Sequence, residues 1–440
     1  MRHHPAEFVS LVVFVALLGV GMGADVAQAT SRPKCQGRRA TIVGTKGKDR
    51  IKGTRRADVI VLKSGNDRVN GRGGNDVICG GDGNDVVMGA GGADRLDAGP
   101  GSDVVSGGRG NDFIGGGTGL ADTVDYLTGA TAAVEVNLPA GIARGRGRDE
   151  IDGIENVTGT PFDDAIYGNN LANALVGGGG NDTILGNRGP DFITPGEGDD
   201  TVNGGGDPDT VDYFFSNPTG PMTIDLFGAD ASATGQGTDS LESIEAAGGG
   251  DFDDTMLGDN GQNAFFGFGG NDTLRGAVGA NDIVQGGLGD DLLDGGTGTG
   301  DTADFLSLPE GAAAVQVNLL AGTATGQGAD TLEGIEKVNG SDFNDSITGD
   351  DAENTLFGFE GDDTIAGLGG NDFISGGAGY DSLDGGDGED DCLSGEENLN
   401  CEFTFLHAQR RRAMNVAHWS TTIRMTVKGD LVVQMYSLRR

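Results

Sequence analysis

Histidine is scarce in this sequence, and so is the usual equipment of hydrolytic enzymes. The chain of 440 residues has four histidines, and none lies between residues 5 and 406. Neither an HExxH motif nor a GxSxG motif occurs, which removes the usual signatures of zinc proteases and serine hydrolases. Paired acidic residues abound, but they belong to a regular repeat, and we therefore expect no enzyme.

Apolar and aromatic residues are also few, at 36 % and 6 % of the chain. Glycine is correspondingly abundant, with 85 residues, which is far above its usual share. A conventional hydrophobic core is not expected from these numbers. Composition alone is typical of a disordered chain. Whether this chain folds therefore has to be judged from the pattern of its residues along the sequence.

Basic residues are outnumbered, with 29 Lys or Arg against 68 Asp or Glu and a formal net charge of −39. The imbalance is uneven along the chain. Residues 30–72 contain 13 basic and 3 acidic residues, whereas residues 73–401 contain 8 and 61. A polyanionic body of this kind repels nucleic acid and anionic lipid and attracts cations.

Long hydrophobic runs are absent except near the start. Arg2 precedes the apolar run FVSLVVFVALLGVGMG (8–23), and small residues follow at Ala27 and Ala29. This order predicts a secretory signal peptide at 1–29, cleaved after Ala29. A retained membrane anchor is the alternative, although the run is short for a bilayer span. We expect a secreted, extracellular protein without membrane insertion of the mature chain.

Four cysteines fit an oxidising compartment. Cys35 and Cys79 flank the basic N-terminal part, and Cys392 and Cys401 lie near the end of the repeats. Neither pair has CxxC spacing, so a zinc site is not expected. Pairing of Cys35 with Cys79 and of Cys392 with Cys401 is favoured over the other combinations, because such bridges would staple both ends of the array.

Aspartate returns every nine residues, as in GRGGNDVICGGDGNDVV (71–87). Eight aspartates stand at this interval from Asp49 to Asp112, and an aliphatic residue follows each of them two positions later. The interval restarts in three further arrays that begin at Asp164, Asp254 and Asp345. Such a regular spacing predicts a folded protein. Disorder remains an expectation only for the chain without bound cations.

Each unit has a glycine-rich hexad suited to a tight turn, followed by three residues long enough for a short strand. Two units make one coil of an all-β, right-handed parallel solenoid whose coils stack about 4.8 Å apart. Aspartates of alternate units then share an edge, so that Asp76 lies beside Asp94 and Asp85 beside Asp103. Carboxylates about 5 Å apart repel one another, and Ca²⁺, which accepts six to eight oxygens, would reverse the sign of that interaction.

The repeats resemble the hemolysin-type, or RTX, calcium-binding nonapeptide GGxGxDxUx. Full matches are GGDGNDVVM (80–88), GGRGNDFIG (107–115), GGLGDDLLD (286–294) and GGAGYDSLD (376–384). The resemblance covers about residues 44–401 and implies a β-roll in tandem arrays with many bound Ca²⁺ ions. The aspartates that it makes candidate calcium ligands are Asp67, Asp76, Asp85, Asp94, Asp103, Asp112, Asp164, Asp182, Asp191, Asp200, Asp209, Asp254, Asp272, Asp282, Asp291, Asp345, Asp363, Asp372, Asp381 and Asp390.

Some units depart from this pattern. The units of Asp49 and Asp58 carry Lys or Arg in place of glycine, and we expect an end cap there. Weak or absent binding is expected where asparagine replaces the ligand, at Asn173, Asn263 and Asn354. Either Asp390 or Asp391 holds the sixth position in the last unit.

A larger repeat of about 90 residues lies over the small one. Copies of ADTVDYLTGATAAVEVNL (121–138) recur at 208–226 and 300–319, and each contains an alternating run that predicts a longer strand. Acidic residues recur at fixed places in the copies and are either further calcium ligands or turn caps: Asp149, Asp239, Asp330, Glu155, Glu245 and Glu336.

The expected organisation follows from these patterns. It consists of the signal peptide 1–29, a basic cap with degenerate repeats at 30–72, a first array at 73–120, modules at 121–207, 208–299 and 300–401, and a basic tail at 402–440. The tail could dock on the acidic body, bind a partner or form an unstructured extension, and the last is favoured.

The function expected from the sequence is a calcium-dependent structural or adhesive binding role outside the cell, with a polysaccharide or cell-surface component as a possible partner. A polysaccharide-modifying enzyme, or an accessory module of one, is the alternative. A surface lattice or ice-binding role has no discriminating motif.

Overall fold

The computed structural model describes residues 32–401 apart from 120, 217, 307–312 and 395–396, together with 424–426 and 432–434. The predicted signal peptide and most of the predicted tail lie outside the described residues. Within the tail, β44 (Arg424–Thr426) pairs antiparallel with β45 (Val432–Gln434). The described residues contain no α-helix, and no helix among them could cross a membrane.

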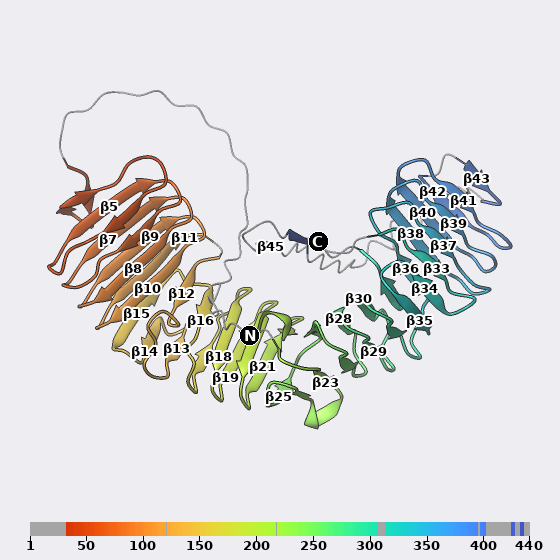
Figure 1. Ribbon diagram of the computed structural model, residues 1–440, viewed down its shortest axis with the longest axis horizontal. Coiled ribbons are helices and arrows are strands. Elements are labelled where there is room, and N and C mark those ends of the chain that lie inside the picture. Colours follow the sequence, from red (N-terminus) through yellow and green to blue (C-terminus); the bar gives the residue numbers. More distant parts are fainter. Residues whose placement is uncertain are drawn as a thin grey trace, which may run out of the picture. The chain divides into compact units, whose positions relative to one another are not determined.

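The chain divides into two compact units, one ending at Gly177 and the other beginning at Gly178. Each unit is a stack of coils, and each coil contributes one strand to a first sheet and one to a second sheet (Figure 1). This arrangement confirms the predicted all-β solenoid of parallel, stacked coils.

The first unit has nine strands in its first sheet and seven in its second. The first sheet consists, in spatial order, of β3 (Ile42–Val43), β5 (Val59–Ser64), β7 (Val77–Asp82), β9 (Arg95–Pro100), β11 (Phe113–Thr118), β15 (Arg148–Asp152), β14 (Ile142–Arg144), β13 (Glu135–Asn137) and β17 (Ala165–Tyr167). The second sheet consists of β4 (Arg50–Lys52), β6 (Arg68–Asn70), β8 (Val86–Gly91), β10 (Val104–Arg109), β12 (Thr123–Asp125), β16 (Asn156–Thr158) and β18 (Ala174–Gly179).

The second unit repeats this plan. Its first sheet consists of β19 (Thr183–Arg188), β21 (Thr201–Gly206), β25 (Thr238–Glu242), β24 (Ser232–Thr234), β23 (Thr223–Asp225), β27 (Thr255–Leu257), β29 (Thr273–Arg275), β31 (Leu292–Asp294), β35 (Ala329–Glu333), β34 (Thr323–Thr325), β33 (Gln316–Asn318), β37 (Ser346–Thr348), β39 (Thr364–Ala366), β41 (Ser382–Asp384) and β43 (Glu397–Leu399). Its second sheet consists of β20 (Phe192–Glu197), β22 (Thr210–Asp212), β26 (Ala246–Gly250), β28 (Ala264–Gly269), β30 (Ile283–Leu288), β32 (Thr302–Asp304), β36 (Lys337–Asn339), β38 (Thr355–Glu360), β40 (Phe373–Ala378) and β42 (Asp391–Leu393). Two short 3₁₀ helices occupy Phe214–Ser216 and Gly228–Asp230.

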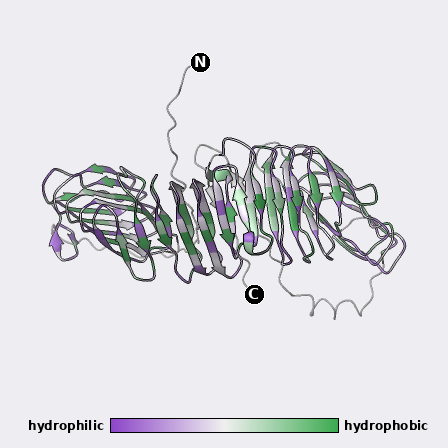
Figure 2. Ribbon diagram, turned by 90° about the horizontal axis from the view of Figure 1, so that it is seen from below, coloured by the Kyte–Doolittle hydropathy of each residue, from purple (hydrophilic) through white to green (hydrophobic). Residues whose placement is uncertain are grey.

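The core of each unit is the line of aliphatic residues that follow the aspartates by two positions. Val69, Val87 and Val105 pair in register along the second sheet, and all three are fully buried. Ile78 and Leu96 do the same in the first sheet. Figure 2 shows apolar residues, coloured green, on the strands of both sheets. One buried aliphatic residue per short strand therefore suffices to define the inward face.

The 90-residue modules interrupt the parallel order with an antiparallel insertion. In the first unit β13, β14 and β15 pair antiparallel in series between β11 and β17, while β16 pairs directly with β18. The alternating run around Val136 does form the predicted strand, but it belongs to this insertion and not to a simple coil. Equivalent insertions are β23–β25 and β33–β35.

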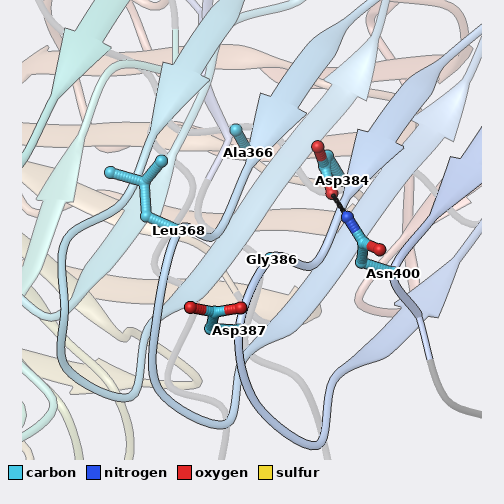
Figure 3. Close-up of a pocket in the computed structure, with 6 residues that line it drawn as sticks. All are labelled: Ala366, Leu368, Asp384, Gly386, Asp387 and Asn400. Atoms are coloured by element: carbon cyan, nitrogen blue, oxygen red, sulfur yellow. Dashed lines mark hydrogen bonds between the residues drawn. The ribbon is translucent and has the colours of Figure 1, made fainter.

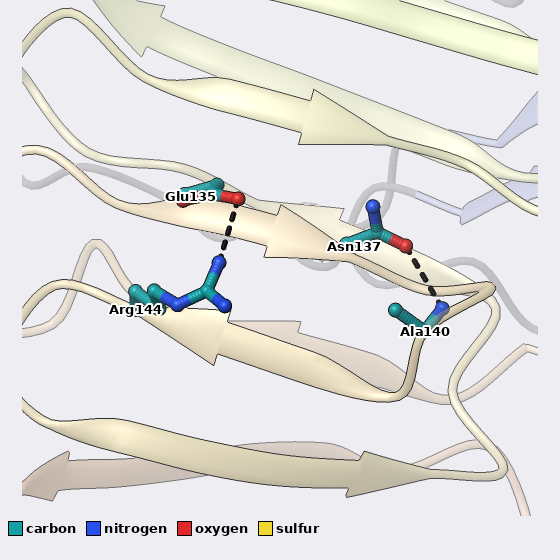
Figure 4. Close-up of polar contacts among 4 residues, drawn as sticks. All are labelled: Glu135, Asn137, Ala140 and Arg144. Atoms are coloured by element: carbon teal, nitrogen blue, oxygen red, sulfur yellow. Dashed lines mark hydrogen bonds and ion pairs between the residues drawn. The ribbon is translucent and has the colours of Figure 1, made fainter.

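The β13–β14 hairpin is fixed by two polar contacts across it (Figure 4). Arg144 Nη1 donates to Glu135 Oε1 at 2.8 Å, and the two residues are direct cross-strand partners. In the turn the Ala140 N–H donates to Asn137 Oδ1 at 2.8 Å. These contacts stabilise the change of chain direction between β13 and β14, which the parallel repeat pattern does not predict.

A short hairpin packs against β5 and β7 near the start of the first unit. Strands β1 (Lys34–Cys35) and β2 (Arg38–Arg39) pair antiparallel, and a disulfide joins Cys35 to Cys79 on β7. Cys35 also packs in a small core with Val61 and Val77. A second disulfide joins Cys392 to Cys401. Both favoured pairings are confirmed.

Candidate metal centre

The aspartates of alternate turns form a column along each edge of a unit. The backbone N–H of each aspartate donates to Oδ1 of the aspartate in the next coil, at 2.7 Å from Asp76 to Asp94 and at 2.6 Å from Asp85 to Asp103. This is the neighbour relation that the sequence predicts. The same bond recurs in the second unit, for example from Asp272 to Asp291 at 2.8 Å.

The second carboxylate oxygen, Oδ2, is left over in these columns. It is buried and accepts no hydrogen bond in the following residues: Asp67, Asp76, Asp85, Asp94, Asp103, Asp112, Asp122, Asp209, Asp254, Asp272, Asp282, Asp291, Asp301, Asp363, Asp372 and Asp390. A buried polar atom without a partner is costly, and a carboxylate oxygen accepts either a hydrogen bond or a cation. Repetition over many successive coils of both units indicates a recurring cation position.

Backbone carbonyl oxygens lie beside these orphaned atoms. At the position where Gly80 lacks a Cβ, Asp85 Oδ2 is 2.5 Å away and the Ala98 carbonyl oxygen of the next coil is also in contact. Gly71 stands in the same relation to Asp76. The missing side chain thus opens a space lined by carboxylate and carbonyl oxygens, which are the ligands that Ca²⁺ prefers.

Glycine is also needed where the turns approach one another. Gly92 has φ +132°, and a Cβ on it would collide with the Gly74 carbonyl oxygen of the preceding coil. The hexad therefore needs glycine both for its backbone conformation and for the close stacking of turns that brings the oxygens together.

Burial and neighbouring charge act on the carboxylates in the same direction. Burial raises the pKa of Asp103 to about 8, with further contributions from the charges of Asp122 and Asp85. In the second unit the pKa of Asp272 is raised to about 8, again chiefly by burial. Keeping these buried, neighbouring carboxylates ionised therefore costs free energy, and a divalent cation bound between them would remove that cost.

Carboxylates alone do not make up the coordination. Among the described residues no three Asp, Glu, His or Cys side chains converge on one point. A cation between the turns would therefore take most of its ligands from backbone carbonyls. Ca²⁺ tolerates such mixed and flexible coordination, whereas Mg²⁺ demands near-octahedral geometry.

The sequence matches the family described as RTX calcium-binding nonapeptide repeat (4 copies) at residues 52–87, 88–119, 176–211, 248–281, 279–300, 339–374 and 367–398. This chain is an RTX calcium-binding nonapeptide-repeat protein. The matched segments contain fourteen of the sixteen residues with an orphaned Oδ2, all but Asp122 and Asp301, so the family assignment and the geometry agree on the binding of calcium. No curated protein gives a significant match.

A second class of turn satisfies its own aspartate. Thr160 donates from its backbone N–H to Asp164 Oδ2 at 2.5 Å and from its hydroxyl to Asp164 Oδ1 at 2.8 Å. Ser341 makes the same two bonds to Asp345. Asp164 and Asp345 are predicted ligands, and in this structure hydrogen bonds occupy the oxygens that a calcium ion would need.

The RTX turns at the start of the first unit are also of this self-capped class. Thr45 donates from its N–H and its hydroxyl to Asp49 Oδ2, and Thr54 does so to Asp58. The turns whose aspartate has an orphaned Oδ2 are called calcium-type turns. In these, except the turn of Asp254, the second residue of the hexad has positive φ, as in Ala90 (φ 81°). The end cap expected for these two units therefore has a specific chemistry, in which threonine replaces the cation.

The three asparagines form a related turn. Asn354 Oδ1 accepts the Asp350 N–H at 2.8 Å, and its amide Nδ2 donates to Asp350 Oδ1 at 3.2 Å. Asn173 and Asn263 bond to Asn169 and Asp259 in the same way. An amide closes these turns without a charge.

The remaining predicted ligands occupy the same place in the columns. Asp200 Oδ1 accepts the Asp182 N–H at 2.7 Å, and the Asp191 N–H donates to Asp209 Oδ1 at 2.8 Å. Asp381 Oδ1 accepts the N–H of the preceding column member at 3.0 Å. The structure thus brings these predicted positions together on the turn edges.

Two members of the columns, Asp122 and Asp301, are not predicted by the nine-residue spacing of the sequence. Asp122 Oδ1 accepts the Asp103 N–H at 2.8 Å, and Asp301 Oδ1 accepts the Asp282 N–H at 2.9 Å. Each lies 19 residues after its neighbour and not 18, because the turn contains one extra residue. The glycine-rich approach and the following Thr were the signal that could have revealed them.

The recurring acids of the modules are caps at the ends of the columns. Asp149 Oδ1 accepts the Asp112 N–H, and its Oδ2 accepts the Tyr126 hydroxyl at 3.2 Å. Asp239 pairs with Tyr213 in the same way at 2.6 Å. Glu155, Glu245 and Glu336 accept backbone N–H groups of the turn before them. For Asp149 and Asp239 the geometry favours the turn-cap interpretation.

A shallow pocket of about 190 Å³ lies near the C-terminal disulfide of the second unit (Figure 3). Asp384 and Asp387 contribute carboxylates to it, and Asp384 Oδ1 accepts a hydrogen bond from Asn400 Nδ2 at 2.8 Å. Since Asp384 is already paired, the pocket does not resemble the calcium-type turns.

Proposed function

We propose that calcium ions bound between neighbouring turns hold this chain in its folded form outside the cell. The supporting observation is the series of buried Oδ2 atoms that accept no hydrogen bond. Two ionised carboxylates 5 Å apart repel by about 3 kcal/mol at an effective dielectric of 20. A divalent cation between them turns this repulsion into attraction, so folding and calcium binding are coupled.

The proposed ligands are the aspartates of the calcium-type turns. They comprise the sixteen residues with an orphaned Oδ2 and, by position in the columns, Asp182, Asp191, Asp200 and Asp381. We leave Asp164 and Asp345 out of this set because Thr160 and Ser341 already donate to their oxygens.

Calcium titration of the full chain tests this proposal. We expect chelation to lower the β-sheet signal in circular dichroism and calcium to restore it, with binding heat measured on the same sample by calorimetry. A spectrum that is the same with calcium and with chelator would refute coupled folding.

We propose a secreted structural or adhesive role and not catalysis. The leader-like segment at 1–29 and the two disulfides support an extracellular location. The column carboxylates are engaged with backbone N–H groups of neighbouring coils, which commits them to the stack. Release of unsaturated or reducing products from uronate polymers by the calcium-loaded protein would overturn this view.

A further inference from the structure

The second sheet of the first unit begins with cations that face one another. Arg50 on β4 and Arg68 on β6 are direct cross-strand partners, and Lys52 is next to them on the same face. All three side chains are exposed. Like charges directly opposite each other destabilise a sheet, so an anionic partner would stabilise this face.

These residues have no ion pair in the structure. Among the described residues the ion pairs are Arg144 with Glu135 and Arg275 with Asp294. The basic strip formed by Arg50, Lys52 and Arg68 is thus uncompensated in a chain of net charge −39. Its position at one end of an otherwise acidic body would orient a polyanion toward this face.

The strip leads along the sheet into a cavity. Lys52 pairs with Asn70, and Asn70 pairs with Met88 on the next strand. Asn70 and Met88 line a cavity of about 220 Å³ together with Arg109 and Arg146. That volume suits one sugar unit, whereas the strip beside it continues over further strands about 4.8 Å apart.

Two polar atoms at the cavity are left without partners. Arg146 donates through Nη1 to the Thr128 carbonyl at 2.8 Å and through Nη2 to the Tyr126 carbonyl at 2.7 Å, but its buried Nε has no hydrogen-bond partner. Asn70 Oδ1 is also buried and unpaired. One orphaned donor and one orphaned acceptor suit a ligand that carries both a carboxylate and a hydroxyl group.

The guanidinium of Arg146 is not needed for its structural contacts. In the other two modules Gln236 and Gln327 stand at the corresponding position, and their amides donate to the Ser216 and Phe305 carbonyls at 3.3 and 3.0 Å. Arg146 instead brings a second positive charge close to Arg109. Burial lowers the pKa of Arg146, the nearby Asp125 carboxylate opposes this shift, and the positive charge of Arg109 adds to it. An anion between the two guanidinium groups would relieve this repulsion.

We propose that this face, from Arg50 to the cavity at Arg146, binds an acidic polysaccharide. A uronate carboxylate interacts with Arg109 and Arg146, because the planar guanidinium fork matches a carboxylate, and a sugar hydroxyl donates to Asn70. Further carboxylates of the same polymer lie along Arg50, Lys52 and Arg68. This inference rests on the proposed function, since the calcium-loaded fold has to place these strands side by side.

Calorimetry with the full-length, calcium-loaded protein tests the inference. The probe is an oligosaccharide of alternating glucuronate and N-acetylglucosamine, with neutral dextran, dextran sulfate and oligo-dT as comparisons. We expect glucuronate binding that weakens with added salt. Arg146→Gln should weaken it at least tenfold while keeping the carbonyl contact that Gln327 makes. Arg109→Gln should act similarly, and Arg275→Gln in the second unit serves as the matched control.

Circular dichroism on the same samples separates this inference from the proposed function. A chain that stays folded under chelation contradicts the proposed function, whereas the binding isotherms still decide the inference. Equal affinity of the wild type and Arg146→Gln, or equal binding of dextran, would overturn it. Tighter binding of oligo-dT or dextran sulfate would assign the strip to phosphate or sulfate and would also overturn it.

Discussion

Asp85→Asn is expected to change stability in opposite directions with and without calcium. The substitution keeps Oδ1, which accepts the Asp67 N–H at 2.8 Å, and removes the charge at the orphaned Oδ2. Burial raises the pKa of Asp85 from 3.8 to about 7, which corresponds to about 4 kcal/mol for keeping this 1 % exposed carboxylate ionised at higher pH. The calcium-free form of the variant should therefore be more stable at pH 8 by up to about that amount.

With calcium the sign should reverse. At a calcium concentration 100-fold above its Kd, an occupied site stabilises the folded chain by about 2.7 kcal/mol, and an asparagine without charge would lose most of this. Asn173 shows how an amide fits such a turn, because its Nδ2 donates to the Glu155 carbonyl at 2.7 Å. The variant should thus resemble one of the natural calcium-free turns.

Amide hydrogen exchange measures both effects at the site itself, through the protection of residues 76–105 with calcium and with chelator. Asp82→Asn removes the same charge from the same turn without touching the column, and it should change protection far less in both conditions. Loss of protection in both conditions for Asp85→Asn would refute the reasoning, and so would an equal response from Asp82→Asn.

Three further perturbations follow from the same geometry. Gly80→Ala places a Cβ 2.5 Å from Asp85 Oδ2, in the space assigned to the cation, and should remove about one calcium ion from the stoichiometry measured by calorimetry; an unchanged stoichiometry would contradict that assignment. Thr160→Val deletes a buried hydroxyl that donates to Asp164 and should cost about 1 to 3 kcal/mol equally with and without calcium, as judged by exchange in residues 160–167; a calcium-dependent loss would show that the turn does bind metal. Because the pKa of Asp103 is raised in the calcium-free fold to about 8, that fold binds more protons than the unfolded chain between about pH 4 and pH 8. Its stability should therefore rise as the pH falls through this window and be lost as the pH rises, which denaturation of the chelated protein at several pH values would check, and a rise with increasing pH would exclude it.

The regular part of the fold could be predicted from the sequence. In every nine residues one aspartate marks the turn edge of the coil, and one aliphatic residue marks the inward face of its strand. Asp76 and Asp85 show this, since their predicted neighbours Asp94 and Asp103 are those found. The antiparallel insertions were not accessible. A run such as that around Val136 alternates equally well in a parallel or an antiparallel strand, and only its pairing with β14 and β17 distinguishes the two.

The candidate site was predictable in position and less so in occupancy. From the sequence spacing alone, Asp164 and Asp85 are both predicted to be calcium ligands. The difference lies at the second residue of the hexad, where Thr160 donates two hydrogen bonds to Asp164 and Gly81 donates none to Asp85. A hydroxyl at that position is a readable signal, but its meaning depends on knowing that the carboxylate folds back onto the start of its own turn.

The self-capped turns are not scattered, and their positions indicate what limits each calcium array. Asp49 and Asp58 open the first array, and Asp164, Asp254 and Asp345 each open a column after an antiparallel insertion. There the N–H bonded to Oδ1 comes from Val134, Met222 or Val315, each of which immediately precedes an insertion strand, and no calcium-type turn lies on that side. Where no facing turn supplies carbonyl oxygens, Thr160 or Ser341 takes over the role of the cation. Asp254 differs from these two because Gly250 has no hydroxyl and offers only its backbone N–H to the carboxylate. Since Asp149 with Tyr126 and Asp239 with Tyr213 close columns at the other end, each insertion separates one stack of calcium sites from the next.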